Sequence, residues 1–265
     1  MKLFAKKSLG QHFLNSPTVL AKIIEAAHIQ EGDRVLEIGP GTGFLTRTLL
    51  DTGARVTAIE KDARAIDMLN QTFFNEIKNG QLKLVAGDVL DQNVITSNLL
   101  VLDPYLLVAN IPYYITGAIL EQFLEHGPRP QRMVLLVQKE VADRIVARDG
   151  KESVLSVSVK VFGTPKMVST VPPGAFTPPP SVDSAILAIE NISSQHFASK
   201  NADIARFFTI LKAGFAHKRK FAARNLESVL PAQQISHIWT QNALDSKIRA
   251  EDIPVEKWLS IGAEC

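Results

Sequence analysis

A glycine loop and two acidic residues have the residue types and spacing that bind an adenosine-containing ligand. The loop is Glu37-Ile38-Gly39-Pro40-Gly41-Thr42-Gly43, Glu60 lies seventeen residues after Gly43, and Asp88 lies further on. Glycines let a backbone approach a ligand closely, and amides at the start of a helix favour negative charge. A carboxylate at position 60 can accept both hydroxyls of a ribose, and Asp88 can accept from an adenine amino group. The alternative interpretation is a tight turn between a strand and a helix, with solvated acids beside it.

The glycine spacing narrows the choice of ligand. The dinucleotide fingerprint G-x-G-x-x-G requires glycine at position 44, where the chain has Phe44. This pattern does not favour a pyrophosphate clamp, and S-adenosylmethionine is the adenosine-containing ligand that fits best. We therefore expect the cofactor contacts to include Gly39, Gly41, Glu60 and Asp88.

A second motif, Asn110-Ile111-Pro112-Tyr113, has the groups needed to activate the amino group of an adenine. That nitrogen is a poor nucleophile because its lone pair is delocalised into the ring. If the Asn110 side-chain oxygen and the Ile111 carbonyl accept its two hydrogens, the nitrogen can pyramidalise and direct its lone pair at a methyl sulfonium. Pro112 stiffens the loop, and Tyr113 can stack on the base with about 1–3 kcal/mol. The alternative is a proline turn with a tyrosine in the core.

The elements that must position these residues alternate between strand and helix. The sequence predicts strands at 34–38, 55–60, 82–86, 105–109 and 132–137, and helices at 17–27, 44–51, 63–74, 116–125 and 139–148. This alternation predicts a parallel sheet with helices on both faces, and ligands of such sheets bind at the carboxyl ends of the strands. The glycine loop, Glu60, Asp88 and Asn110 each come at the end of a predicted strand or just after it.

The pattern changes after residue 150. Segments 154–161 and 168–171 are rich in β-forming residues, five prolines between 172 and 180 mark a rigid loop, and 184–190 reads as a last strand. Segment 191–200 is polar, and helices are predicted at 202–216, 218–230, 231–241 and 255–261. We therefore expect an α/β domain over 1–190, with a Rossmann-like class I S-adenosylmethionine-dependent methyltransferase sheet, and a small all-α domain over 191–265.

Composition excludes several classes of protein. The 265 residues are 46% hydrophobic and 21% charged, which excludes wholesale disorder. The one cysteine, Cys265, excludes a disulfide framework and a cysteine-rich zinc site. The six scattered histidines form no metal-ligand cluster, so we expect no metal. No apolar run approaches the roughly 18 residues that span a bilayer. We expect a soluble, cytoplasmic, monomeric protein with no membrane partner.

The charge is distributed unevenly. Residues 191–265 hold 10 Lys/Arg against 7 Asp/Glu, and 206–226 holds six basic residues and no acidic one. Such a patch on a nearly neutral protein favours a polyanionic partner over a merely solvated face. The residues that we expect to contact this polyanion, an RNA if the adenine that the motif at 110–113 predicts belongs to one, are Lys6, Lys7, Arg144, Arg148, Lys218, Arg219, Lys220 and Arg224.

Six stretches in order make the chain resemble the ribosomal RNA adenine N6-dimethyltransferase family, most closely its small-subunit type. They are Ser8–Leu14 (SLGQHFL), Glu37–Gly43 (EIGPGTG), Asn110–Thr116 (NIPYYIT), Gln138–Ala142 (QKEVA), Phe176–Ala185 (FTPPPSVDSA) and Phe215–Lys220 (FAHKRK). The chain departs from the family pattern at His12, where asparagine is also common, so the contact there can be a ring nitrogen. Lys218-Arg219-Lys220 stands where a double arginine is usual.

The resemblance implies both the reaction and further site residues. It implies cofactor contacts from His12, Leu14, Gly39, Glu60, Asp88 and Asn110, and a ring at Phe176 that stacks on the target base opposite Tyr113. The implied reaction transfers two methyl groups from S-adenosylmethionine to N6 of each of two adjacent adenosines. These adenosines lie in the 3′-terminal hairpin loop of small-subunit (16S) ribosomal RNA, so the implied partner is an immature ribosomal subunit during ribosome biogenesis.

Three alternatives remain open. A related large-subunit (23S) ribosomal RNA methylase of the macrolide-resistance type shares the Asn-x-Pro-Tyr core, but Gln138-Lys139-Glu140 and Lys218-Arg219-Lys220 favour the small-subunit type. A non-catalytic nucleic-acid-binding factor is disfavoured by the intact motif at 110–113. A methyltransferase for a protein glutamine or a small molecule would leave the basic C-terminal segment unexplained.

Overall fold

The computed structural model describes residues 4–6, 10–99, 104–199 and 202–264, which divide into two compact units. The first unit comprises Met1–Ala142 and Lys166–Glu190, and the second comprises Asp143–Pro165 and Asn191–Cys265. We expected all of 1–190 to belong to one domain, whereas Asp143–Pro165 groups with the C-terminal unit. Separate folding of 1–190 and 191–265 stays a prediction.

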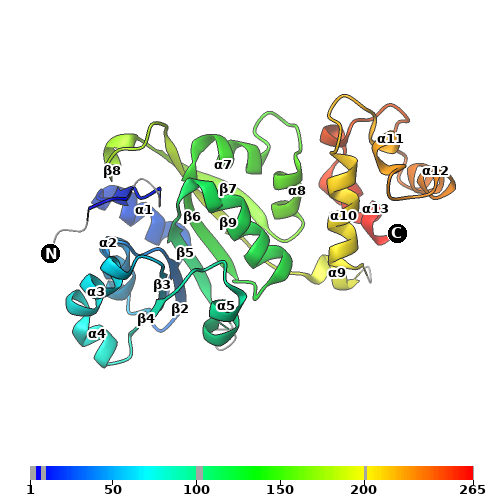
Figure 1. Ribbon diagram of the computed structural model, residues 1–265. Helices are drawn as coiled ribbons and strands as arrows, with labels where there is room; N and C mark the ends of the chain where they lie inside the picture. The colour runs from blue at the N-terminus through cyan, green and yellow to red at the C-terminus, as the bar shows by residue number, and fades with distance from the viewer. Residues whose placement is uncertain (1–3, 7–9, 100–103, 200–201, 265) are drawn as a thin grey trace. The chain divides into compact units, whose positions relative to one another are not determined.

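The first unit is built on a seven-stranded sheet in the order β4-β3-β2-β5-β6-β9-β7 (Figure 1). The strands are β2 (Arg34–Ile38), β3 (Arg55–Glu60), β4 (Leu82–Ala86), β5 (Leu106–Asn110), β6 (Arg132–Gln138), β7 (Thr164–Val171) and β9 (Ser184–Glu190). Strands β2 to β6 pair in parallel, but β9 runs antiparallel to β6. The sheet is therefore mixed, which corrects the expectation of a wholly parallel one.

Helices cover both faces of the sheet because the central strands, such as β5 and β6, are apolar at nearly every position. Val56 and Ala58 of β3 share one buried cluster with Leu20, Leu49 and Leu69 from three helices. The helices of this part of the chain are α1 (Pro17–Ala27), α2 (Phe44–Asp51), α3 (Ala63–Thr72), α4 (Phe74–Lys78), α5 (Gln92–Leu99), α6 (Thr116–Leu120), a π-helix (Glu121–His126) and α7 (Lys139–Val146). On the opposite strand face, Leu36, Leu107 and Leu135 are also fully buried, so both faces of the sheet are covered.

Local sequence signals explain where several elements begin and end. The predicted bounds of α1 and α2 are confirmed, and the Ser16 hydroxyl accepts from the amide of Val19 at the start of α1. The single helix predicted over 63–74 is wrong because Phe73 leaves the helical conformation, which separates α3 from α4. The Phe73 side chain is buried, so this break places its ring in the core.

Two short strands join distant parts of the chain next to the sheet. In the antiparallel pair of β1 (Phe13–Leu14) and β8 (Phe176–Thr177), Leu14 lies opposite Phe176. A 3-10 helix, Pro173–Ala175, precedes β8. This pair was not predictable from the sequence, because a strand of two residues is too short to show a periodic pattern of apolar residues.

The second unit is helical. Its elements are α8 (Val154–Lys160), α9 (Gln195–Ser199), α10 (Ile204–Gly214), α11 (Ala222–Leu226), α12 (Ala232–Gln241), a 3-10 helix (Ala250–Asp252) and α13 (Val255–Ala263). The β-rich assignment of 154–161 is wrong: Ser153 and Ser156 form a reciprocal capping box that starts a helix despite its valines. The helix predicted over 218–230 is shorter, because 215–221 is a loop. None of the helices in the described residues has the length and apolar character needed to cross a membrane.

Candidate functional site

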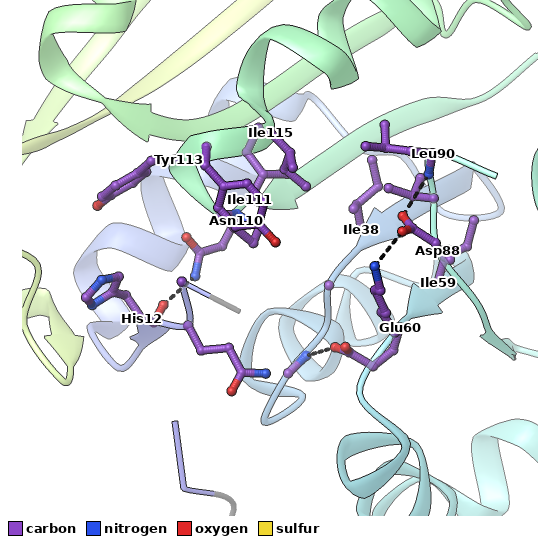
Figure 2. A pocket seen from close by; sticks show the side chains of 18 of the residues that line it. His12, Ile38, Ile59, Glu60, Asp88, Leu90, Asn110, Ile111, Tyr113 and Ile115 are labelled. Carbon is purple, nitrogen blue, oxygen red and sulfur yellow. Dashed lines mark hydrogen bonds and ion pairs between the residues drawn. The ribbon is translucent and has the colours of Figure 1, made fainter. Parts of the chain in front are cut away.

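A pocket with a volume of about 230 Å³ lies at the carboxyl ends of the parallel strands. This volume is far more than the ~15 Å³ that holds one water molecule, so the pocket has the size of a ligand site. Its lining includes residues that follow β2, β3, β4 and β5, together with the N-terminal segment: Gly10, Gln11, His12, Phe13, Ile38, Gly39, Gly41, Ile59, Glu60, Lys61, Gly87, Asp88, Val89, Leu90, Asn110, Ile111, Pro112, Tyr113, Tyr114 and Ile115. Figure 2 shows the side chains that face one another there.

The glycine loop requires glycine for two different reasons. Gly41 and Gly43 both have positive φ, 55° and 79°. A side chain at Gly41 would lie 3.0 Å from the Phe13 ring beside the pocket, and one at Gly43 would lie 2.5 Å from the Phe73 ring in the core. Gly41 thus keeps the backbone open to the pocket, while Gly43 lets α2 begin against α3.

Glu60 is held by the backbone around it. One carboxylate oxygen accepts from the amide of Gly41 at 3.0 Å, and the other accepts from the amide of Asp62 at 2.8 Å. Burial raises the pKa of Glu60, and these amides partly oppose that shift. Each carboxylate oxygen has a second lone pair, so Glu60 can still accept the hydroxyls of a ribose.

Asp88 lies across the pocket and is already paired. Its carboxylate accepts from Lys61 Nζ at 2.7 Å and from the amide of Leu90 at 3.0 Å. The Lys61 ammonium lowers the pKa of Asp88, so this group is an anion at neutral pH. It can accept a hydrogen bond from an amino group but cannot donate one.

Two carboxyls near the loop were not singled out by the sequence analysis. Glu37, in β2, is 1% exposed, and neither carboxyl oxygen has a hydrogen-bond partner among the described residues. It shares a strand face with Val35 and the apolar cluster, and this burial raises the pKa of Glu37 to about 8. Asp62 instead pairs with Arg64 at 2.5 Å, and the guanidinium lowers the pKa of Asp62 to about 2.

Asn110, the last residue of β5, has its amide orientation fixed by the N-terminal segment. Its Nδ2 donates to the main-chain carbonyl of His12 at 3.0 Å. Because a carbonyl can only accept, this bond assigns the nitrogen and leaves Oδ1 as the acceptor on the pocket side (Figure 2). Ile111, which follows, also lines the pocket. The roles of Asn110 Oδ1 and the Ile111 carbonyl as acceptors for one amine stay predictions.

Tyr113 and His12 face one another beside Asn110. Their ring centroids are 6.0 Å apart and the ring planes differ by 18°. The Tyr113 hydroxyl and Ser184 Oγ are 2.6 Å apart, and His12 Nδ1 lies 2.8 Å from the carbonyl oxygen of Pro178. Both rings are thus fixed by residues from the segment around β8 and β9.

Two expected site residues lie in the core instead of the pocket lining. Phe176 is 3% exposed and Leu14 is 5% exposed, and both belong to the buried cluster under the sheet. Their pairing in β1 and β8 places them opposite one another. The stacking role of Phe176 and the cofactor contact of Leu14 stay predictions.

The expected RNA-binding cations differ in how they are partnered. Lys6, Arg144, Lys218, Arg219 and Lys220 are exposed, and the structure shows no ion pair for them within its described residues. Arg148 pairs with Asp143 at 3.1 Å, and Arg224 pairs with Glu227 at 2.9 Å. Lys7 lies outside the described residues. The three unpaired cations at 218–220 share one loop of the second unit.

One group of side chains has potential metal ligands. In the part of the chain that the structure describes, ligand atoms of Glu121, Glu125 and His126 lie within 4.8 Å of one another. All three belong to the π-helix and none lines the pocket. The expectation that the reaction needs no metal stays a prediction.

Comparisons with known proteins cover nearly the whole chain. A family model described as ribosomal RNA adenine dimethylase matches residues 3–265. The chain is 41% identical to the ribosomal RNA small subunit methyltransferase A of Dehalococcoides mccartyi, covering 99% of this chain and 89% of that protein. It is 40% identical to the protein of the same name from Thermosynechococcus vestitus, covering 97% and 95%.

Two solved structures have the same fold over both units. A dimethyladenosine transferase from Plasmodium falciparum has a TM-score of 0.75 at 28% identity, covering 94% of this chain and 96% of that one. The 23S rRNA methyltransferase ErmE has a TM-score of 0.70 at 25% identity, covering 95% and 98%. These matches confirm the expected fold class, a Rossmann-like methyltransferase sheet followed by C-terminal helices.

Proposed function

Because the chain belongs to the ribosomal RNA adenine dimethylase family, we propose that it dimethylates N6 of two adjacent adenosines in the 3′-terminal hairpin loop of small-subunit ribosomal RNA. The relatives named ribosomal RNA small subunit methyltransferase A support this choice of subunit. The partner is an immature small ribosomal subunit, and the place of action is the cytoplasm. A monomeric state stays a prediction.

The pocket fits S-adenosylmethionine as the methyl donor. Gly41 leaves the backbone open where a side chain would meet Phe13, and Glu60 retains acceptor capacity for a ribose. Gly39, Gly41, Glu60 and Asp88 would hold the donor, which supplies an electrophilic methyl group when bound. The Asp88 anion suits an adenine amino group, because such a group needs an acceptor.

The orientation of the Asn110 amide is the observation that carries this proposal. Its nitrogen is bound to the carbonyl of His12, so Oδ1 and the Ile111 carbonyl are available to accept the two hydrogens of an adenine amine. In the first transfer, accepting both hydrogens would localise the lone pair on nitrogen. The nitrogen loses one proton for each methyl group that it gains, so one hydrogen is left to be accepted in the second transfer. The fixed φ of Pro112 stiffens the loop that carries these acceptors. Holding nitrogen and methyl in line supplies most of the remaining rate enhancement.

Labelled methyl transfer to purified ribosomal subunits tests the proposed function. Undermethylated small subunits and large subunits are incubated separately with the protein and labelled S-adenosylmethionine, and the product nucleoside is identified. We expect N6,N6-dimethyladenosine from small subunits only. Transfer to large subunits alone would support the macrolide-resistance type. Subunit binding without any transfer would support a non-catalytic factor, and either result contradicts the proposal.

A further inference from the structure

The cationic loop of the second unit is anchored at both of its ends. This loop, 215–221, joins α10 to α11 (Figure 1). At its start, the Phe215 ring stacks on the buried Trp258 ring, with centroids 5.4 Å apart. Just after its end, the amide of Ala222 donates to the carbonyl of Ile248 at 2.9 Å. The side chains between these anchors are exposed.

A tight turn within the loop carries two of the cations. The amide of Lys220 donates to the carbonyl of His217 at 3.0 Å, and a bond between residues three apart closes a β-turn. Lys218 and Arg219 are the two central residues of this turn, and both are exposed. The turn therefore fixes the backbone from which these two cations extend.

Asn225, a buried residue of α11, holds the base of that turn. Its Nδ2 donates to the carbonyl of His217 at 3.2 Å and to the carbonyl of Gly214 at 2.6 Å. Because a carbonyl can only accept, these two bonds assign the nitrogen of the amide. Gly214 is the last residue of α10, so one side chain joins the end of that helix to the first residue of the turn.

The packing of α11 alone does not favour an amide at this position. Asn225 is 4% exposed, and its Oδ1 is buried with no hydrogen-bond partner among the described residues. A buried acceptor without a partner costs free energy, and asparagine is a poorer helix former than alanine or leucine. The other buried residues of the helix, Ala222 and Leu226, are apolar. What the amide adds at 225 is its pair of bonds to the loop and to the end of α10.

We propose that Asn225 is a positioning residue for the RNA substrate. It holds the 217–220 turn in its binding conformation before RNA arrives, so Lys218 and Arg219 meet phosphates on a backbone that is already ordered. A loop with the same charges and a mobile backbone binds more weakly, because ordering it on binding reduces the affinity. This inference rests on the proposed function, because it takes ribosomal RNA as the polyanion.

A double-mutant cycle between Asn225 and the two cations tests the positioning role. The four proteins are wild type, Asn225→Ala, the double variant Lys218→Ala with Arg219→Ala, and the triple variant. The dissociation constant for undermethylated small subunits is measured for each at one salt concentration, with the melting temperature in parallel. We expect Asn225→Ala to weaken binding by roughly 5- to 30-fold, which corresponds to ordering the backbone of about one residue.

The same substitution should have little further effect in the double variant, because the turn then has no cations to position. Wild-type affinity in Asn225→Ala would overturn the inference. An equal loss of affinity in both backgrounds would also overturn it, because Asn225 would then act through the fold of the whole unit.

Asn242→Ala is the matched control in the same unit. Asn242 is 5% exposed, and its Nδ2 donates to the carbonyl of Ile238 at 3.0 Å and to the Glu264 carboxylate at 3.1 Å. Its replacement should lower the melting temperature, as that of Asn225 does, and leave the affinity for small subunits at the wild-type value. A matching loss of affinity would contradict a specific role for Asn225.

Hydrogen exchange of the wild-type protein tests the turn without any variant. In the free protein, the Lys220 amide should exchange at least about tenfold more slowly than in a peptide spanning 215–221, because its bond to His217 is already formed. Equal exchange rates would overturn the inference. Failure of the proposed function is a different result, namely no methyl transfer to small subunits by the wild-type protein.

Discussion

Two acids beside the glycine loop have pKa values shifted in opposite directions because their surroundings differ. Glu37 is buried without a hydrogen-bond partner among the described residues, and its pKa is raised to about 8. The Asp62 carboxylate accepts hydrogen bonds from the Arg64 guanidinium and the Gln11 side-chain amide, and these lower the pKa of Asp62 to about 2. Glu37 is therefore largely neutral at pH 7, whereas Asp62 is an anion that ties the N-terminal segment to the start of α3.

The titration of Glu37 predicts how stability depends on pH. Its folded pKa of about 8 lies above the ordinary value of 4.5, so the folded state holds an extra proton between these values. The free energy of unfolding should therefore fall by about 1.4 kcal/mol per pH unit across this window. Urea unfolding from pH 5 to 8 measures it, and Glu37→Gln, which mimics the neutral acid, should remove this component.

The matched control for that measurement is Glu31→Gln, at an exposed glutamate in the turn before β2. This substitution should leave the pH dependence of the wild-type protein intact. If Glu37→Gln and wild type fall in parallel with rising pH, the buried carboxyl does not carry the proton.

The positions of site residues were predictable from the sequence where those residues lie at the end of a strand or directly after it. Gly39, Glu60, Asp88 and Asn110 each end or follow a strand, and the parallel register brings these ends to one edge. The contact between Asn110 and His12 was not predictable, because it joins a side chain to the main-chain carbonyl of a residue 98 positions away. The buried position of Phe176 depends in the same way on a distant pairing.

At the scale of elements, the glycine loop couples the pocket to the packing of two helices. Gly41 borders the pocket, while Gly43 begins α2 at the point where Phe73 and Leu69 pack. The Arg47 guanidinium of α2 also lies over the Phe73 ring, 4.6 Å from its centroid. The break between α3 and α4 therefore places the Phe73 ring where it packs against the first turn of α2, the helix that follows the glycine loop.

Alanine substitutions at two loop glycines should separate backbone strain from crowding. Both Gly39 and Gly43 have positive φ, but a side chain at Gly39 meets nothing within 4 Å. Gly39→Ala should cost about 1–2 kcal/mol of unfolding free energy from backbone strain alone. Gly43→Ala should cost roughly 1–3 kcal/mol more, because its side chain would overlap the Phe73 ring. Equal losses in urea unfolding would contradict this account of the loop.

Element types were predictable where the periodicity was strong, and wrong where local capping competed with it. The strands at 34–38, 55–60, 82–86 and 184–190 are confirmed. In α8, the valines favour a strand, but two serines satisfy the free amides of a helix start. Single-residue propensities for strand or helix do not include the two reciprocal hydrogen bonds between Ser153 and Ser156.

At the scale of the whole molecule, sequence stretches far apart in the chain converge on one pocket. His12, Asn110, Tyr113 and the segment around Pro178 and Ser184 are joined by hydrogen bonds of 2.6–3.0 Å. The amide of Lys139 also donates to the carbonyl of Asp183. With the glycine loop, which lines the same pocket, five of the six stretches that carry the family resemblance therefore lie in the first unit. The cationic loop at 215–221 belongs to the second unit.

The exposed cations of the loop at 215–221 should determine how strongly the affinity for RNA depends on salt concentration. Lys218 and Arg219 are exposed, and the structure pairs neither of them with an acid among the described residues. Replacing both with alanine should flatten the plot of log affinity against log salt for undermethylated small subunits by about 1.5, at ~0.7–0.9 for each phosphate contact. Lys78→Ala, at another exposed lysine, is the control. An unchanged slope in the double variant would assign these charges to a solvated surface.

The central claim is that the oriented Asn110 oxygen activates the target amine, and single-turnover methyl transfer at saturating donor and small subunit tests it most directly. Asn110→Ala should lower the rate by about 10²–10³-fold, as the loss of one preorganised hydrogen bond does. Asn110→Asp keeps an acceptor oxygen but loses the bond to the His12 carbonyl. Its rate of methyl transfer should therefore lie between that of the wild-type protein and that of Asn110→Ala. Affinity for S-adenosylmethionine should change by only a few-fold in both variants. A near-normal rate for Asn110→Ala with the donor bound would contradict the account.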